Sequence, residues 1–252
     1  MSFAVAAASY DRFMGRYSTQ LSPQLADLAE VAAGQRVLDV GCGPGALTAK
    51  LVERLGTEAV SAVDPSESFV AALRERHPEV DVQRASAESL PFPDRTFDAT
   101  LAQLVIHFMT DPVTGLGEMK RVTRPGGVVA ACVWDYAGER GPHGPFWEAA
   151  RQLDPDVVDE SDLPGVRQGH LSELFYAAGL REVEESTVSA AIEHPTLEDW
   201  WEPFTLGVGP AGSYLAGLTL ARQLKLRDLC ADLLSDFPFV QTAHAWAVRG
   251  VV

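Results

Sequence analysis

Three glycines stand directly after a short apolar run in the stretch RVLDVGCGPGALTAKL, from Arg36 to Leu51. The run predicts a buried strand, and the residues after Gly45 repeat apolar side chains at helical spacing. Glycines at such a junction let the backbone approach a ligand closely, at the N-terminus of the following helix. The loop from Gly41 to Ala46 therefore predicts a site for a nucleotide-like molecule. It also satisfies the G-x-G-x-x-[GA] pattern of dinucleotide-binding loops.

Such glycine-rich loops bind either dinucleotides or S-adenosylmethionine, and two carboxylates help to decide between these ligands. Asp64 ends the next apolar run, where an acidic side chain can accept hydrogen bonds from both hydroxyls of a ribose, which suits either ligand. Asp39 precedes Gly41 by two residues, where it would repel a pyrophosphate and attract the ammonium and sulfonium groups of S-adenosylmethionine. The residues therefore favour S-adenosylmethionine over NAD.

Alternating strands and helices must position these residues. The pattern predicts strands at 36–41, 58–64, 80–86, 97–106, 128–134, 181–193 and 240–250. It predicts helices at 21–33, 45–55, 65–77, 111–122 and 170–180. Such alternation is typical of an α/β fold with a parallel sheet covered on both faces. Ligands in these folds bind beyond the carboxyl ends of the strands.

Two segments interrupt the alternation, at residues 136–169 and 195–236. The first is rich in Gly, Pro and Asp and contains a short helical pattern at 145–153, whereas the second predicts helices at 196–204 and 213–234. We expect a single domain over residues 1–252, with an N-terminal helical cap at residues 1–33. The two inserts are expected to meet above the sheet as a substrate cap.

Four successive motifs carry a resemblance to a known family. VLDVGCGPGALT, AVDPSES, ASAESLPFPDRTFDATLAQLVIHFMTDP and RVTRPGGVVAACVW resemble, in order, the motifs of class I S-adenosylmethionine-dependent methyltransferases. The most similar group is the small-molecule, type 11-like one, in which the third strand leads to A-E-x-L-P-F. The resemblance covers residues 36–135. It implies a Rossmann-like, doubly wound sheet of seven strands, mostly parallel with an antiparallel last strand.

The resemblance also implies which residues hold S-adenosylmethionine. They are Asp39, Gly41, Gly43 and Gly45 around the methionine part, Gln103 at its end, Asp64 at the ribose, and Pro65, Ser66, Ser86, Ala87 and Glu88 around the adenine. Some relatives have Asp where this chain has Ser86, and Glu88 is the candidate to replace it. The segment SYDRFMGRYS resembles a piece that caps the cofactor, which adds Tyr10, Arg16 and Tyr17. Their spacing is equally that of an amphipathic helix packed on the domain.

His107 follows the predicted strand 97–106, where the resemblance places the transferred methyl group. It is the candidate catalytic residue, as a general base, because imidazole titrates near neutrality. We favour a packing role beside Phe108, since the sulfonium is already activated and alignment alone can drive transfer. Aromatic side chains in and beside the inserts are expected to line an apolar substrate pocket: Trp134, Phe146, Trp147, Trp200 and Trp201.

The amino-acid composition argues against several classes of binding partner. A formal net charge of -15 argues against binding to duplex nucleic acid or to an anionic membrane surface. The three cysteines are far apart and the histidines lack metal-ligand spacing, so neither a disulfide framework nor a metal site is expected. The acidic run from Asp154 to Asp162 is expected to be a solvated loop. No signal peptide or membrane span is expected, and a cytoplasmic location fits.

The expected function is methyl transfer from S-adenosylmethionine to a small-molecule acceptor. One alternative is a catalytically silent S-adenosylmethionine-binding regulatory protein, which the cofactor loop alone does not distinguish from an enzyme. The other is an NAD-dependent oxidoreductase, which Asp39 disfavours. The sequence holds no signal for the number of subunits.

Overall fold

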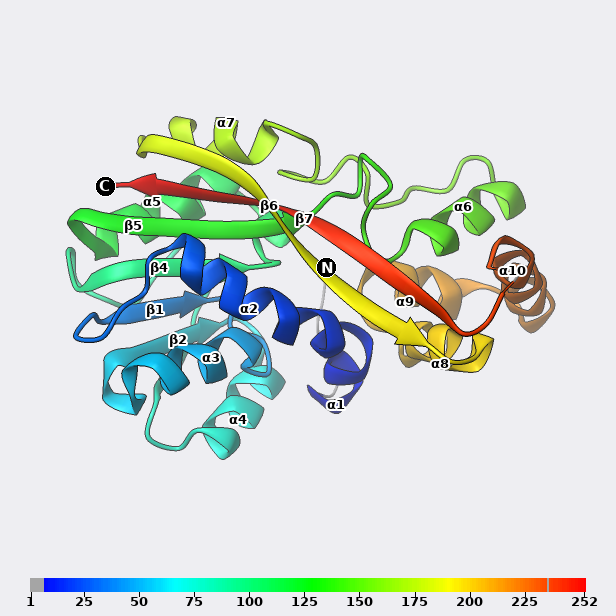
Figure 1. Ribbon diagram of the computed structural model, residues 1–252, viewed down its shortest axis with the longest axis horizontal. Coiled ribbons are helices and arrows are strands. Elements are labelled where there is room, and N and C mark those ends of the chain that lie inside the picture. Colours follow the sequence, from blue (N-terminus) through cyan, green and yellow to red (C-terminus); the bar gives the residue numbers. More distant parts are fainter. Residues whose placement is uncertain (1–6, 235) are drawn as a thin grey trace.

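The computed structural model describes residues 7–234 and 236–252 of the chain (Figure 1). Seven strands form one sheet in the order β3-β2-β1-β4-β5-β7-β6. Their bounds are β1 (Val37–Val40), β2 (Val60–Asp64), β3 (Asp81–Arg84), β4 (Phe97–Gln103), β5 (Thr123–Trp134), β6 (Arg181–His194) and β7 (Phe239–Val251). Strands β1 to β5 pair in parallel, and β7 runs antiparallel to both β5 and β6. The predicted Rossmann-like sheet is confirmed.

Helices cover both faces of this sheet, because the central strands are buried on both sides. One face carries α2 (Arg16–Leu28), α3 (Ala46–Leu55) and α4 (Glu67–Arg76), and the other carries α5 (Pro112–Val122) and α7 (His170–Ala177). Each layer buries its own apolar core, which includes Leu51 on the first face and Phe175 on the second. Short 3₁₀ turns, η2 (Thr57–Ala59) and η3 (Ile106–Phe108), complete this body.

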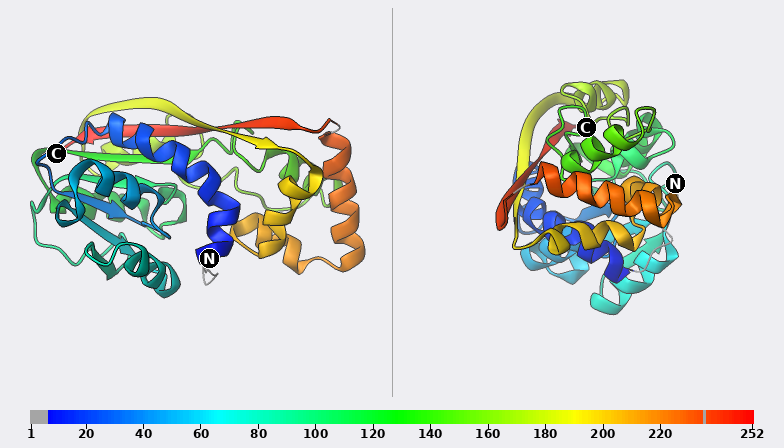
Figure 2. Two further views of the ribbon diagram at one scale, coloured as in Figure 1. Left: turned by 60° about the horizontal axis from the view of Figure 1, so that its bottom comes forward. Right: turned by 90° about the vertical axis from the view of Figure 1, so that its right-hand side faces the viewer.

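The last two strands extend past the rest of the sheet. β5 pairs with β7 as far as Trp134 opposite Ala245, whereas β6 and β7 remain paired as far as His194 opposite Phe239. This two-stranded extension carries the second insert at its tip, beyond the carboxyl end of β5 (Figures 1 and 2). The insert therefore lies on the side of the sheet where ligands are expected.

Both inserts contain helices, although most of the first insert is loop. The first contains α6 (Gly144–Leu153), and the second contains α8 (Leu197–Trp201), the 3₁₀ segment η4 (Glu202–Leu206), α9 (Gly209–Gly217) and α10 (Leu220–Leu233). α6 packs against α10, so the two inserts meet. The described part of the chain begins with α1 (Ala7–Tyr10) and the π-helical segment η1 (Asp11–Gly15). η1 contacts η4, and α2 then crosses the sheet (Figure 2). The first six residues of the expected cap lie outside the described residues.

Two predicted helices are wrong in extent. The helix expected at 21–33 begins at Arg16 and ends at Leu28. The helix expected at 213–234 is two helices, because Leu218 and Thr219 adopt extended backbone angles after Gly217. The amide of Gln223 donates hydrogen bonds to the carbonyls of Leu215 and Leu218, which satisfies the end of α9.

Candidate active site

A cavity of about 850 Å³ lies at the carboxyl ends of the parallel strands. Its walls come from the loops that follow β1, β2 and β3, from the segment after β4, and from the N-terminal segment. Open α/β sheets bind their ligands at this edge, and the volume suits a cofactor of nucleoside size. We refer to it as the main cavity.

Two glycines of the loop after β1 are required by conformation and by close packing. Gly41 has a φ of +69°, and a Cβ there would lie 2.4 Å from Cγ2 of Val105. Gly45 has a φ of +106°, and a Cβ there would lie 2.4 Å from Cδ1 of Leu73. A side chain at either position would displace the loop. Gly41 and Gly43 line the main cavity, whereas Gly45 precedes α3 and does not line it.

Asp64, at the end of β2, holds this loop on the cavity wall. Its Oδ2 accepts a hydrogen bond of 2.9 Å from the backbone N–H of Gly43, and its Oδ1 accepts one of 2.8 Å from that of Ser66. Burial raises the pKa of the carboxyl, and the two N–H donors oppose that rise. The side chain lines the cavity at the position expected to face a ribose.

Asp39 is buried beneath the glycine loop with one oxygen unused. Its Oδ2 accepts a hydrogen bond of 2.6 Å from Oγ1 of Thr48, whereas its Oδ1 has no partner within the described residues. Burial raises the pKa of this carboxyl to about 7. A buried acceptor without a partner is costly unless a ligand or water supplies a donor.

Gln103 presents a second unused oxygen at the end of β4. Its Nε2 donates to the carbonyl of Ser18 at 3.0 Å, and its buried Oε1 has no partner in the described chain. Gln103 lines the main cavity, and Asp39 lies on the neighbouring strand β1. Two unpaired acceptor oxygens complement an ammonium group, which carries only donors. The residues present therefore fit the methionine end of S-adenosylmethionine.

The residues expected around the adenine also line the main cavity: Pro65, Ser66, Ser86, Ala87 and Glu88. Glu88 has a structural task as well, because its Oε1 accepts hydrogen bonds from the backbone N–H groups of Thr110 and Asp111. It joins the loop after β3 to the segment before α5.

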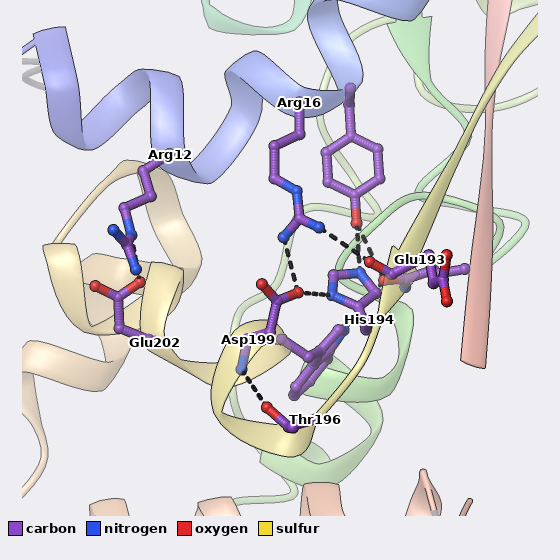
Figure 3. A network of polar contacts seen from close by, with 10 residues as sticks. Arg12, Arg16, Glu193, His194, Thr196, Asp199 and Glu202 are labelled. Carbon is purple, nitrogen blue, oxygen red and sulfur yellow. Dashed lines mark hydrogen bonds and ion pairs between the residues drawn. The ribbon is translucent and has the colours of Figure 1, made fainter. Parts of the chain in front are cut away.

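The three expected cap residues separate into two groups. Tyr10 lines the main cavity and packs against Phe69, with 5.2 Å between ring centroids. Arg16 and Tyr17 do not line it. Arg16 forms an ion pair with Asp199 and donates to the carbonyl of Glu193 (Figure 3). The hydroxyl of Tyr17 donates to Oε1 of Gln241. Both side chains attach the N-terminal segment to the second insert and its strands.

A small cavity of about 20 Å³ adjoins the main one, and Tyr10, Leu104 and Phe108 line both. It has room for roughly one water molecule. Of the aromatic residues expected to line a substrate pocket, Trp134 lines this small cavity. The other four are buried in the core between the inserts, the N-terminal segment and the strands: Phe146, Trp147, Trp200 and Trp201. Their role as a substrate pocket stays a prediction.

His107 lines the small cavity and not the main one. It is buried on η3, with 4.0 Å between its ring centroid and that of Phe108, and its Nδ1 has no partner among the described residues. Burial lowers the pKa of its imidazole to about 4, so the ring is neutral at pH 7. The role of His107 as a base stays a prediction.

The sequence did not point to a polar cluster beside His107. Glu160 is 1 % exposed, so the expectation of a solvated loop for 154–162 is wrong at this residue. Its Oε2 lies 2.9 Å from Nδ1 of His143 and accepts a hydrogen bond of 2.9 Å from Nε1 of Trp147. Tyr136 joins the cluster, with 3.4 Å between its hydroxyl and Nδ1 of His143. Only the fold brings these residues together, since no local pattern links them.

Two further searches cover only the described part of the chain. No group of three or more His, Cys, Asp or Glu side chains there could hold a metal ion. No helix among the described residues is long and apolar enough to cross a membrane.

Comparisons with known proteins agree with this geometry. Residues 38–131 match a family model described as a methyltransferase domain. An uncharacterized methyltransferase of Mycobacterium tuberculosis is 38% identical over 140 residues, which cover 56% of this chain and 54% of that protein. A protein of Mycolicibacterium smegmatis, named a probable S-adenosylmethionine-dependent methyltransferase, is 28% identical over 184 residues, or 69% of this chain and 70% of that one.

Among solved structures, the YcgJ protein of Bacillus subtilis has a TM-score of 0.58 at 19% identity, over 91% of this chain and 97% of that one, which shows the same fold. Over residues 38–131 the chain therefore carries a methyltransferase domain of the kind that uses S-adenosylmethionine. It spans about half the length of the curated relatives that it matches at 38% identity.

Proposed function

We propose that this protein transfers the methyl group of S-adenosylmethionine to a small-molecule acceptor. The observation that carries the proposal is the main cavity, with Asp64 and Gln103 on its wall, and Asp39, which does not line it, buried on the neighbouring strand β1; Oδ1 of Asp39 and Oε1 of Gln103 are unpaired within the described residues. These groups match a ribose and an ammonium, and none is suited to a pyrophosphate.

When bound, the cofactor supplies a methyl group that its sulfonium has already activated. The contribution of this chain is then to bind and to orient. Asp64 would accept hydrogen bonds from the ribose hydroxyls, while Asp39 and Gln103 would accept them from the ammonium group. Tyr10, Leu104 and Phe108 separate the main cavity from the small one, so they would exclude water from the path between donor and acceptor.

Two observations support a small-molecule acceptor. The two inserts pack against each other beyond the carboxyl end of β5, where they would limit the size of an acceptor, and the net charge of -15 does not suit a nucleic acid. Relatives include an aklanonic acid methyltransferase of a Streptomyces, 29% identical over 135 residues, and a malonyl-[acyl-carrier protein] O-methyltransferase of Pectobacterium atrosepticum, 34% identical over 129 residues. The expected cytoplasmic location likewise remains a proposal.

Calorimetry and turnover test this function in order. The protein should bind S-adenosylmethionine and S-adenosylhomocysteine and bind NAD far more weakly. Incubation with S-adenosylmethionine and a cell extract of low-molecular-weight compounds should then release S-adenosylhomocysteine and give a product heavier by one methylene. Tight binding of NAD without binding of S-adenosylhomocysteine would refute the cofactor. Tight cofactor binding without turnover would favour the catalytically silent alternative.

A further inference from the structure

The small cavity has a polar side that the cofactor does not use. His143 and Glu160 line it together with His107 and Tyr136, and the rest of its wall is mainly apolar, including Phe13, Met14, Trp134 and Val208. Because this cavity shares three lining residues with the main one, it lies next to the place where a methyl group would be transferred.

The hydrogen bonds of Glu160 determine how the ring of His143 is protonated. The carboxylate accepts from Nε1 of Trp147 and lies 2.9 Å from Nδ1 of His143. Burial alone would raise the pKa of Glu160. His143 and Trp147 lower it by more than burial raises it, so the pKa of Glu160 lies below its usual range. An ionised Glu160 accepts from Nδ1–H, so the neutral ring keeps its lone pair on Nε2. No hydrogen bond within the described residues engages that Nε2.

The ring of His143 is also held in place by stacking. Phe13 lies on it with 4.9 Å between centroids at an interplanar angle of 27°, and Tyr136 stacks on it at 5.7 Å and 24°. An imidazole oriented by a buried carboxylate and fixed between two aromatic rings has the arrangement of a positioned general base.

The side chains that line the small cavity indicate which class of acceptor it can bind. No Lys or Arg occurs among the described residues that line the small cavity, so a phosphate or carboxylate would find no cation there. Oε2 of its one carboxylate already faces Nδ1 of His143 and accepts from Trp147, so an ammonium would have to compete with these two partners. A neutral amine needs no base before its lone pair attacks. The remaining class is an apolar molecule with a hydroxyl acidic enough for imidazole to deprotonate.

We propose that His143, oriented by Glu160, is the general base for a phenol- or enol-type hydroxyl on an apolar acceptor. This inference rests on the proposed methyl transfer. As Nε2 of His143 takes the hydroxyl proton, the oxygen forms a bond to the methyl carbon and the bond from sulfur to that carbon breaks. The sulfonium becomes the neutral thioether of S-adenosylhomocysteine, and the positive charge passes to the imidazolium, which Glu160 stabilises.

An acceptor of this size needs more than the 20 Å³ that the small cavity offers. Phe13 and Met14 form its N-terminal wall, and Val208 and Pro210 form its wall from the second insert. Entry therefore requires the N-terminal segment to move relative to that insert. His143 lines this cavity and a neighbouring one, and the titratable and charged groups that line either of them with it are Tyr10, Arg12, Arg16, Tyr17, His107, Tyr136, Glu160 and His194.

The first test uses the unmodified protein and a matched set of probes, 1-naphthol, 1-naphthylamine and 1-naphthoic acid. Release of S-adenosylhomocysteine should be fastest with 1-naphthol, by at least about tenfold, and should fall on acidification, because a protonated base cannot accept the hydroxyl proton. Turnover with the amine or the acid but not with 1-naphthol would overturn this inference and leave the proposed function intact. So would turnover with a cell extract and none with the whole set.

Variants then assign the base. His143→Asn should lower the single-turnover rate with 1-naphthol by about a hundredfold or more and abolish the acidic limb of the pH–rate profile. Glu160→Gln should lower the rate by about tenfold and shift the limb.

His194→Asn is the matched control, because its Nδ1 lies 2.9 Å from Oδ2 of Asp199, also an imidazole–carboxylate pair (Figure 3). This control should keep the acidic limb. S-adenosylhomocysteine affinity shows that each variant is folded, and a folded His143→Asn that keeps the rate and the limb would refute the assignment.

Discussion

Arg16 and Asp199 lie 183 residues apart in the chain, yet Nη1 of the arginine is 3.0 Å from Oδ2 of the aspartate. This ion pair joins the N-terminal segment to the second insert, with Arg12 and Glu202 forming a parallel pair at 2.7 Å (Figure 3). Asp199 also faces Nδ1 of His194 at 2.9 Å. These contacts connect the two parts of the wall through which, in our proposal, an acceptor enters the small cavity.

Removing the Arg16 pair should loosen that wall at small cost to the whole fold. We expect Arg16→Ala to lower the free energy of unfolding by about 0.5–1 kcal/mol, because both partners are about one third exposed. Cleavage within the N-terminal segment by a dilute protease should become several-fold faster. Arg167→Ala is the control, since its pair with Glu173 lies outside the N-terminal segment and the insert helices. If the protease cleaved the N-terminal segment of both variants at the same rate, the Arg16–Asp199 pair would not tether that segment.

Asp64 supports a prediction about affinity. Asp64→Ala should weaken S-adenosylmethionine binding by roughly tenfold to a hundredfold, because it removes charge-assisted hydrogen bonds worth about 1.5–3 kcal/mol. It should also release the N–H groups of Gly43 and Ser66, so some stability should be lost as well. Calorimetry on the folded variant measures the first effect, and thermal unfolding without ligand measures the second. A folded variant with unchanged affinity would show that Asp64 only braces the loop.

The sequence predicted the sheet and the main cavity because their signals are local. Buried strands read as apolar runs, and the φ values of Gly41 and Gly45 are a property of the loop itself. Glu160 was misjudged because its neighbours in the chain are polar, whereas its partners His143 and Trp147 come from a different part of the insert.

The partners of Arg16 and Tyr17 were beyond prediction for the same reason. Helical spacing identifies which side chains share a face, but it does not say what that face meets. In the fold, Arg16 and Tyr17 contact β6, β7 and α8, more than 160 residues further along the chain, and do not line the main cavity. The break at Leu218 was not predicted because Gly217 and Thr219 can both occur within a helix. The extended turn depends on the packing of α10 against α6, which the local sequence does not indicate.

Asp39 should link pH to both stability and cofactor binding. Because burial raises its pKa to about 7, the folded protein keeps a proton that the unfolded chain loses near its ordinary pKa. Its contribution to stability is therefore full below about pH 4 and is lost as the pH rises to about 7. Asp39→Asn should lack this fall. Without ligand, the variant should gain stability relative to the original protein as the pH rises across that range, as measured by urea unfolding.

The same carboxyl should release a proton when the cofactor binds, since an ammonium beside Asp39 favours the ionised form. Calorimetry at pH 7 in buffers of different ionisation enthalpy should show release of a fraction of a proton per S-adenosylmethionine. Asp39→Asn should bind more weakly and release less. Identical proton release from the two proteins would place the ammonium elsewhere.

The final prediction separates the two histidines of the small cavity. If His107 were the base, the rate would fall only as the pH approached about 4, because burial lowers its pKa to about that value. If His143 is the base, His107 takes no part in the proton transfer. His107→Gln should therefore reduce single-turnover methyl transfer to 1-naphthol by less than about tenfold and leave the acidic limb where it is. Saturating acceptor is needed, so that weaker packing of the wall is not mistaken for slower chemistry. A loss of about a hundredfold together with the disappearance of the limb would make His107 the base and return His143 and Glu160 to a structural pair.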